Sequence, residues 1–194
     1  PASAVGWEKL VYAGAAKKAI FLGTYHEPSS EPNQALLAYD FEANRWDILD
    51  TGGLFHEENM PEAGHPAGSF AYDEANGVIA YYCCASGSNQ YENVWHTWWF
   101  DPLGQVGRDK QTSPKPKMAY DFQQTGSYIA ANRTFVVFNA GVTYSYDPAK
   151  NTWTDLHPNG TPPPAGVSNT SMDYDSRNGK LYAFGGQTVY GPPS

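Results

Sequence analysis

Histidine and glutamate occur together in two segments of this sequence, and they are its first candidates for chemistry. The segments are 25–31 and 55–65, and the residues concerned are His26, Glu27, His56, Glu57, Glu58 and His65. Imidazole and carboxylate are suitable ligands for a first-row metal ion, but no spacing here matches a strong motif such as H-E-x-x-H. We therefore interpret these residues as a partner-binding surface, and we predict neither a metal site nor a cofactor.

Three aromatic residues extend the same candidate surface: Tyr25, Tyr91 and Trp95. Aromatic rings at a loop can stack on a sugar or anchor a protein partner, because they combine apolar area with a polar tip. The alternative is that these rings pack at the rim of the core. The sequence contains no glycine-rich phosphate loop, no G-x-S-x-G nucleophile elbow and no paired-cysteine zinc motif, so we predict no catalytic residues.

The two cysteines, Cys83 and Cys84, are adjacent. They can be two reduced, small apolar residues or a strained disulfide within a turn, and they lack the C-x-x-C spacing of a redox motif. Three N-x-[ST] tripeptides begin at Asn132, Asn159 and Asn169, and glycosylation there requires a secreted setting. The compartment stays open, with an extracellular location favoured.

Composition limits the possible partners and the fold class. The formal net charge is −8, which argues against a nucleic-acid partner, and no apolar run approaches the roughly 20 residues that span a bilayer. Aromatic residues make up 15% of the chain, with 19 Gly and 15 Pro. Apolar residues show no sustained helical periodicity, so we predict an all-β protein with helix nearly absent.

A repeated pattern indicates how the strands are organised. Tyr-x-x-x-Asn begins at Tyr72, Tyr128 and Tyr174, with a weaker copy at Tyr12, and an apolar strand follows each copy. These second strands are predicted near 19–23, 78–83, 134–139 and 180–184. The starts lie 60, 56 and 46 residues apart, close to the roughly 50 residues of one class of propeller repeat.

A second recurring element follows the first. Asp40 precedes Trp46 by six residues and Asp147 precedes Trp153 by six, whereas Gly107 occupies the corresponding place in the middle copy. This spacing predicts two strands folded across a tight turn, with the Asp side chain capping backbone amides. The third strands are predicted near 35–39, 94–100 and 143–146, and we interpret the recurrent Tyr and Trp as packing between repeats.

The segments LYAFGG (181–186) and YDPAKNTW (146–153), followed by PPPAG (162–166), resemble kelch repeats, which form β-propellers. At the position after the second strand, the double glycine of such repeats is kept in the last copy as Gly185-Gly186, whereas the equivalent pairs are Gly23-Thr24, Cys83-Cys84 and Asn139-Ala140. The resemblance implies a propeller of four-stranded blades, with about three and a half blades forming an incomplete ring. The blades are expected at 8–60, 66–116, 124–160 and 168–194, the last incomplete. We expect the rest of a longer chain, or another subunit, to complete the propeller.

In such blades the connections alternate between two ends of the sheet. The long connections fall together at one end: 24–34 and 84–93 between second and third strands, and 50–67, 109–126 and 157–168 between blades. The short turns at 74–77, 130–133 and 176–179 fall at the opposite end. Long connections commonly carry function. We therefore predict a non-catalytic scaffold that recognises a protein or glycan partner at this end.

Two alternatives remain. One is a copper-radical oxidase resembling galactose oxidase, whose catalytic domain is a kelch propeller, although no motif of this chain matches it residue by residue. The other is a structural subunit completed by another chain, because an unfinished sheet edge favours pairing.

Overall fold

The computed structural model describes an all-β protein. It describes the residues 10–24, 34–49, 69–84, 95–104, 106–114, 116, 125–139, 142–161 and 167–188. Within these ranges the only helical element is η1 (Gly14–Ala16), a single 3-10 turn. The predicted fold class, all-β with helix nearly absent, is confirmed for this part of the chain.

The strands form three four-stranded antiparallel sheets and one two-stranded sheet, each in sequence order. The first sheet contains β1 (Leu10–Ala13), β2 (Lys18–Thr24), β3 (Gln34–Asp40) and β4 (Arg45–Leu49). The second sheet contains β5 (Ser69–Asp73), β6 (Val78–Cys84), β7 (Trp95–Asp101) and β8 (Val106–Asp109). The third sheet contains β9 (Thr125–Ile129), β10 (Thr134–Asn139), β11 (Val142–Asp147) and β12 (Thr152–Asp155). The fourth sheet contains β13 (Val167–Asp175) and β14 (Lys180–Thr188). Every strand predicted from the sequence overlaps one of these.

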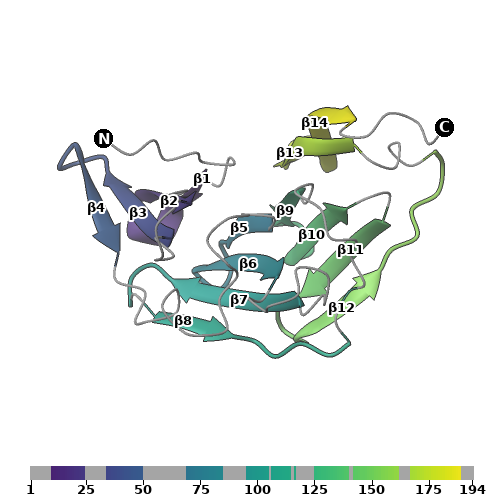
Figure 1. The fold of residues 1–194 in the computed structure, drawn as a ribbon, viewed down its shortest axis with the longest axis horizontal. Coiled ribbons are helices and arrows are strands. Elements are labelled where there is room, and N and C mark those ends of the chain that lie inside the picture. Colours follow the sequence, from purple (N-terminus) through teal and green to yellow (C-terminus); the bar gives the residue numbers. More distant parts are fainter. Residues whose placement is uncertain are drawn as a thin grey trace, which may run out of the picture.

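The four sheets follow one another around an open arc (Figure 1). The first strands of successive sheets are neighbours, since β1 contacts β5, β5 contacts β9 and β9 contacts β13. The last strands, β4, β8 and β12, lie on the outer side of the arc (Figure 1). Each sheet is therefore joined to the next one along the chain through its first strand.

Two hydrophobic clusters fill the spaces between sheets. The first cluster joins the first and second sheets and consists of Ala13, Ile20, Ala38, Leu49, Phe70, Tyr72, Ile79, Tyr81, Trp98 and Phe100. The second joins the second and third sheets and consists of Ala71, Ala80, Tyr82, Phe135, Val137, Tyr146 and Trp153. Alternate residues of the middle sheet point to opposite clusters, as the two-residue period of a strand requires. The core is thus divided into layers between sheets, because no single sheet can bury both of its faces alone.

A row of directly paired residues crosses each four-stranded sheet at the same level, and we call it the cross-strand row. In the third sheet it consists of Tyr128, Phe135, Tyr146 and Trp153. In the second sheet it consists of Tyr72, Ile79, Phe100 and Gly107, and in the first of Tyr12, Ala19, Tyr39 and Trp46. The repeat recognised in the sequence therefore corresponds to one structural level, and Gly107 does occupy the Trp position of the second sheet.

Trp153 confirms the prediction that the recurrent tryptophan packs between repeats. Its side chain is 6% exposed, and its ring centroid lies 4.5 Å from that of Tyr82 in the second sheet. The Trp153 indole N–H donates a hydrogen bond to the Thr97 hydroxyl at 2.9 Å. Trp46 behaves differently, with 54% of its side chain exposed, because no other sheet of the described residues packs on that face of the first sheet.

The tight turns share one capping device, as the sequence predicted. The aspartate at the end of the preceding strand accepts hydrogen bonds from the backbone N–H groups two and three residues further on. This applies to Asp40, Asp73, Asp101, Asp147 and Asp175. The carboxylates thus accept hydrogen bonds from backbone N–H groups of the turn, which have no partner in a neighbouring strand.

These hydrogen bonds favour the charged form of the carboxylates. The Lys150 ammonium group, 2.8 Å from a carboxylate oxygen of Asp147, holds the pKa of Asp147 below its usual value, and two backbone N–H groups add to the effect. The side-chain amide of Asn178 similarly lowers the pKa of Asp175. The pKa of each group is thus lower in the folded chain than the ordinary value of 3.8.

We expect the protein to lose stability as the pH falls below about 4. A carboxylate with a lowered folded pKa contributes its stabilisation fully above its unfolded pKa, and this contribution disappears as the pH falls through the folded pKa. The urea midpoint should therefore be lower at pH 3 than at pH 7. Asp147→Asn is a suitable control, because its amide oxygen can still accept the backbone N–H groups but does not titrate. The difference between the two midpoints should shrink in this variant, and an unchanged difference would show that Asp147 does not contribute to the acid sensitivity.

Candidate binding face

The antiparallel order of each sheet places its connections at two opposite ends. The connections after second strands and after fourth strands leave one end, which we call the loop face. The turns after first and third strands leave the other end, which we call the turn face. The turn face carries short four-residue turns at 74–77, 130–133 and 176–179, as predicted.

Contacts between sheets show that the turn faces of neighbouring sheets lie on the same side. The backbone N–H of Ala15, in the turn after β1, donates a hydrogen bond to the Tyr72 hydroxyl at 3.1 Å. Tyr72 itself lies just before the corresponding turn of the second sheet. Burial raises the pKa of Tyr128 in the third sheet, and the nearby Asp73 carboxylate at the second sheet's turn raises it further. The first three sheets therefore point in the same direction, and their loop faces lie together.

The candidate residues chosen from the sequence belong to connections at the loop face. Tyr25, His26 and Glu27 follow β2, Tyr91 precedes β7, and the segment between β4 and β5 holds His56, Glu57, Glu58 and His65. All of these lie outside the described residues, so their convergence stays a prediction. Trp95 is the first residue of β7, where its backbone pairs with Cys84.

The start of the connection after β8 makes contacts that sequence reasoning did not single out. Lys110, directly after β8, places its ammonium group 3.9 Å from the centre of the Trp99 ring. Its backbone N–H donates to the Thr97 carbonyl oxygen at 2.8 Å, and the Thr97 and Thr112 hydroxyls lie 3.1 Å apart. The Asn151 side-chain amide donates to the Lys110 carbonyl oxygen at 2.8 Å.

These contacts fix the start of the connection between the second and third sheets. A cation over an indole face contributes about 0.5–1 kcal/mol at an exposed site. No sequence pattern marks this segment, because Lys110 and Trp99 meet only through the pairing of β7 with β8. The residues directly after β8 are thus held against the third sheet, where their partner Asn151 belongs to the turn between β11 and β12.

His157 also follows a fourth strand, β12. It is exposed, and its Nδ1 lies 3.4 Å from a carboxylate oxygen of Asp155. Among the described residues, no group of three or more His, Cys, Asp or Glu side chains is close enough to hold a metal ion. In the same part of the chain, no helix has the length and apolar character needed to cross a membrane.

No protein-family model matches the chain, and no curated protein matches it significantly. Among solved structures, an auxiliary nutrient binding protein from Bacteroides thetaiotaomicron is similar to 98% of this chain, with a TM-score of 0.54 and 11% sequence identity. The chain spans 44% of the length of that structure. At this identity the likeness concerns the fold alone.

Proposed function

We propose that the chain is a non-catalytic, kelch-like β-propeller scaffold that recognises a protein or glycan partner through its loop face. The observation that carries the proposal is the separation of its connections. The long segments leave one end of the sheets, whereas capped turns of a few residues occupy the other. Such an arrangement leaves one surface free to vary without disturbing the sheets.

Two further observations support the proposal. The sheets follow one another in sequence order with their first strands adjacent, as in a propeller. The solved structure with the similar fold is described as a nutrient binding protein. The candidate residues combine carboxylates with aromatic rings, which suit a cationic protein surface and a sugar ring, respectively.

We expect Glu27→Gln, Glu57→Gln and Glu58→Gln together to weaken binding of a lysine-rich peptide, mainly through slower association at low salt. Charges at the rim of a binding surface mainly steer the encounter, so raising the salt concentration should reduce the difference from the unmodified chain. Stopped-flow association rates at two salt concentrations measure the effect. The stability of the chain should hardly change, because exposed charges contribute little.

Glu42→Gln with Glu74→Gln is the matched control, because both glutamates are exposed in turns of the turn face. For each charge that it removes, this double variant should change the association rate much less than the loop-face variant does. If each removed charge slowed association equally on both faces, the effect would come from the net charge of the chain. That result would contradict a binding site on the loop face.

A panel of soluble polysaccharides distinguishes a glycan partner from a protein partner. Replacing Tyr25, Tyr91 and Trp95 by Ala should abolish glycan binding, because no aromatic ring would then be left at these positions to stack on the face of a sugar ring. The control is Leu103→Ala, an exposed apolar residue in a turn of the turn face. Glycan binding that survives the triple substitution would remove these aromatic residues from the proposed site.

A further inference from the structure

The sequence contains three Asn-Gly dipeptides, at 76–77, 159–160 and 178–179. An asparagine followed by glycine can react with its own backbone, because the glycine nitrogen can attack the carbonyl carbon of the asparagine side chain. Glycine has no Cβ to obstruct this approach, and its backbone adopts conformations that other residues avoid. The structure distinguishes the three sites, because hydrogen bonds hold the reacting groups in two of them.

The site at 76–77 belongs to the capped turn between β5 and β6. The Asn76 side-chain amide donates a hydrogen bond to a carboxylate oxygen of Asp73 at 2.7 Å. The Gly77 backbone N–H donates to the Asp73 carbonyl oxygen at 2.9 Å. The same aspartate therefore holds both reacting groups, and the turn must open before the Gly77 nitrogen can reach the side chain of Asn76.

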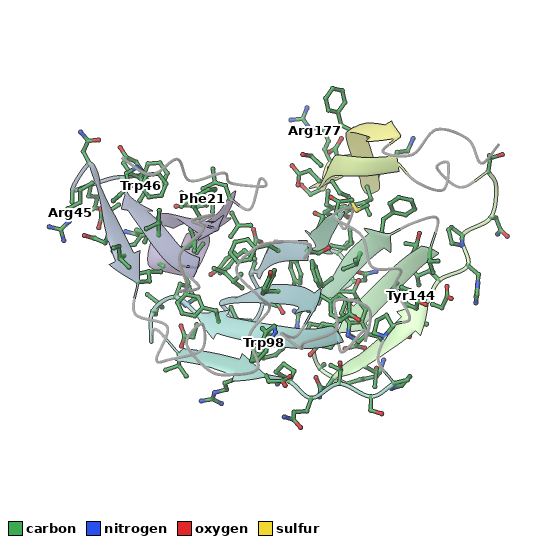
Figure 2. The ribbon with its side chains drawn as sticks, in the orientation of Figure 1. Phe21, Arg45, Trp46, Trp98, Tyr144 and Arg177 are labelled. Carbon is green, nitrogen blue, oxygen red and sulfur yellow. The ribbon has the colours of Figure 1, made fainter. Side chains whose placement is uncertain are left out.

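The turn between β13 and β14 repeats this arrangement around Asp175. The Asn178 amide donates to the Asp175 carboxylate at 2.5 Å, and the Gly179 N–H donates to the Asp175 carbonyl oxygen at 2.9 Å. Figure 2 shows Arg177, the residue before Asn178, in this turn of the fourth sheet. Residues 176–179 are exposed. Exposure to solvent alone therefore does not leave an Asn-Gly site free to react.

The third site lies in the connection after β12. Among the described residues, the last backbone hydrogen bond from this connection to the third sheet runs from the Leu156 N–H to the Thr143 carbonyl oxygen, at 2.9 Å. Residues 156–161 are all exposed, and Figure 1 shows the segment running away from β12. Within the described part of the chain, neither the Asn159 side chain nor the Gly160 N–H has a hydrogen-bond partner. The two groups are therefore free to approach each other.

We propose that Asn159 deamidates spontaneously, whereas the turns that hold Asn76 and Asn178 protect these two residues. The Gly160 nitrogen gives up its proton and forms a bond to the side-chain carbonyl carbon of Asn159. The carbon–nitrogen bond of the side-chain amide breaks, and ammonia leaves with that proton. Water then opens the resulting succinimide ring at either carbonyl carbon, which gives aspartate or isoaspartate. Water is the only reactant from outside the chain.

Either product carries a carboxylate in place of a neutral amide. The formal net charge becomes more negative than −8, and the new charge lies in the connection after a fourth strand, at the loop face. In isoaspartate the backbone also continues through the side-chain carbonyl carbon, which lengthens it. The reaction therefore changes the charge and the backbone of a loop-face connection and leaves the sheets intact.

The test is to incubate the folded 194-residue chain in mildly alkaline buffer and to follow each asparagine by peptide mapping with tandem mass spectrometry. We expect Asn159 to deamidate at least about tenfold faster than Asn76 or Asn178, because local opening of the turn must precede reaction at those two sites. Ion-exchange chromatography should show a more acidic form accumulating. Asn159→Gln should remove this form, because the longer side chain would have to close a less favourable ring.

Unfolding the chain shows whether the fold causes the difference between the sites. In guanidinium chloride the three asparagines should deamidate at rates within about threefold of one another, because each precedes a glycine and the turns are no longer formed. In the folded chain, Asp175→Ala removes the carboxylate that holds the Asn178 amide. This variant should therefore deamidate faster at Asn178 and at an unchanged rate at Asn159, and circular dichroism should show unchanged strand content.

Three results would overturn the proposal. The first is Asn76 or Asn178 reacting as fast as Asn159 in the folded chain. The second is Asn159 staying intact in the folded chain under conditions where it reacts in the unfolded chain. The third is the same selectivity in the unfolded chain, which would assign it to local sequence instead of the hydrogen bonds of the turns. None of these measurements requires a binding partner, so the failure of the proposed function would leave them unaffected.

Discussion

Replacing Trp153 with Ala should lower the free energy of unfolding by about 3–5 kcal/mol, the range for a large aromatic side chain removed from a core. The physical reason is that Trp153 holds the second and third sheets together. Its ring packs against Tyr82 across the interface and against Tyr146 and Phe135 within its own sheet. The surrounding strands are fixed by backbone pairing, so the site cannot collapse to fill the space.

The hydrogen bond from the Trp153 indole adds a polar contribution to this loss. The Thr97 hydroxyl accepts that bond and is fully buried, with the Thr112 hydroxyl as its second partner. Without the indole, the buried Thr97 hydroxyl loses the N–H group that donates to it. A buried acceptor without its donor is unfavourable. Trp153→Phe should accordingly cost less than Trp153→Ala but remain measurably destabilising.

Trp46→Ala is the matched control for this experiment. Trp46 occupies the same row position in the first sheet, but most of its side chain is exposed. Its removal should cost less than about 1 kcal/mol, as expected for an exposed position. Urea unfolding followed by circular dichroism measures both variants. Equal losses from the two substitutions would contradict the interface between the second and third sheets.

The comparison of these two tryptophans shows what the sequence could predict. Strand positions followed from local alternation and from the spacing of Tyr, Asp and Trp, because these patterns reflect pairing within one sheet. Burial depends on the neighbouring sheet, which lies roughly fifty residues away and is not encoded in the local pattern. Trp46 and Trp153 therefore have the same sequence context but different environments.

The candidate site was predictable only in its location. The chain reverses direction from each strand to the next, so the connections after second and fourth strands must leave the same end of a sheet. The loop face could therefore be predicted from the order of the strands. The positions of side chains such as His26 and His56 within those segments have no periodicity from which to derive them. The contact of Lys110 with Trp99 was also beyond prediction, because it depends on the register of β7 and β8.

Gly126 marks another feature that no local pattern predicted, namely the close approach of β9 to β5. A Cβ atom at Gly126 would lie 2.8 Å from the Cβ of Ser69 on β5. It would also lie 2.9 Å from the Phe135 ring and 2.9 Å from the Val136 carbonyl oxygen. Two of these neighbours are backbone or near-backbone atoms, so they cannot move away without shifting a strand.

Gly126→Ala should therefore destabilise the protein by about 1–3 kcal/mol, the usual cost of inserting a methyl group into a packed core. Gly14→Ala is the matched control, because the nearest atom to its added Cβ is the Tyr12 ring at 4.0 Å. That substitution should change the free energy of unfolding by less than about 0.5 kcal/mol. Urea unfolding of both variants gives the comparison.

A second-site change identifies the clash that causes the loss. Ser69→Gly removes the Cβ closest to the added methyl group, so Gly126→Ala should be less destabilising in the Ser69→Gly background than in the unmodified chain. The rescue should be partial, because the contacts with Phe135 and Val136 remain. A double-mutant cycle measures this coupling directly, since the two residues are in contact. A coupling of zero would mean that β5 and β9 are further apart than described, and the packing of the second sheet on the third would need revision.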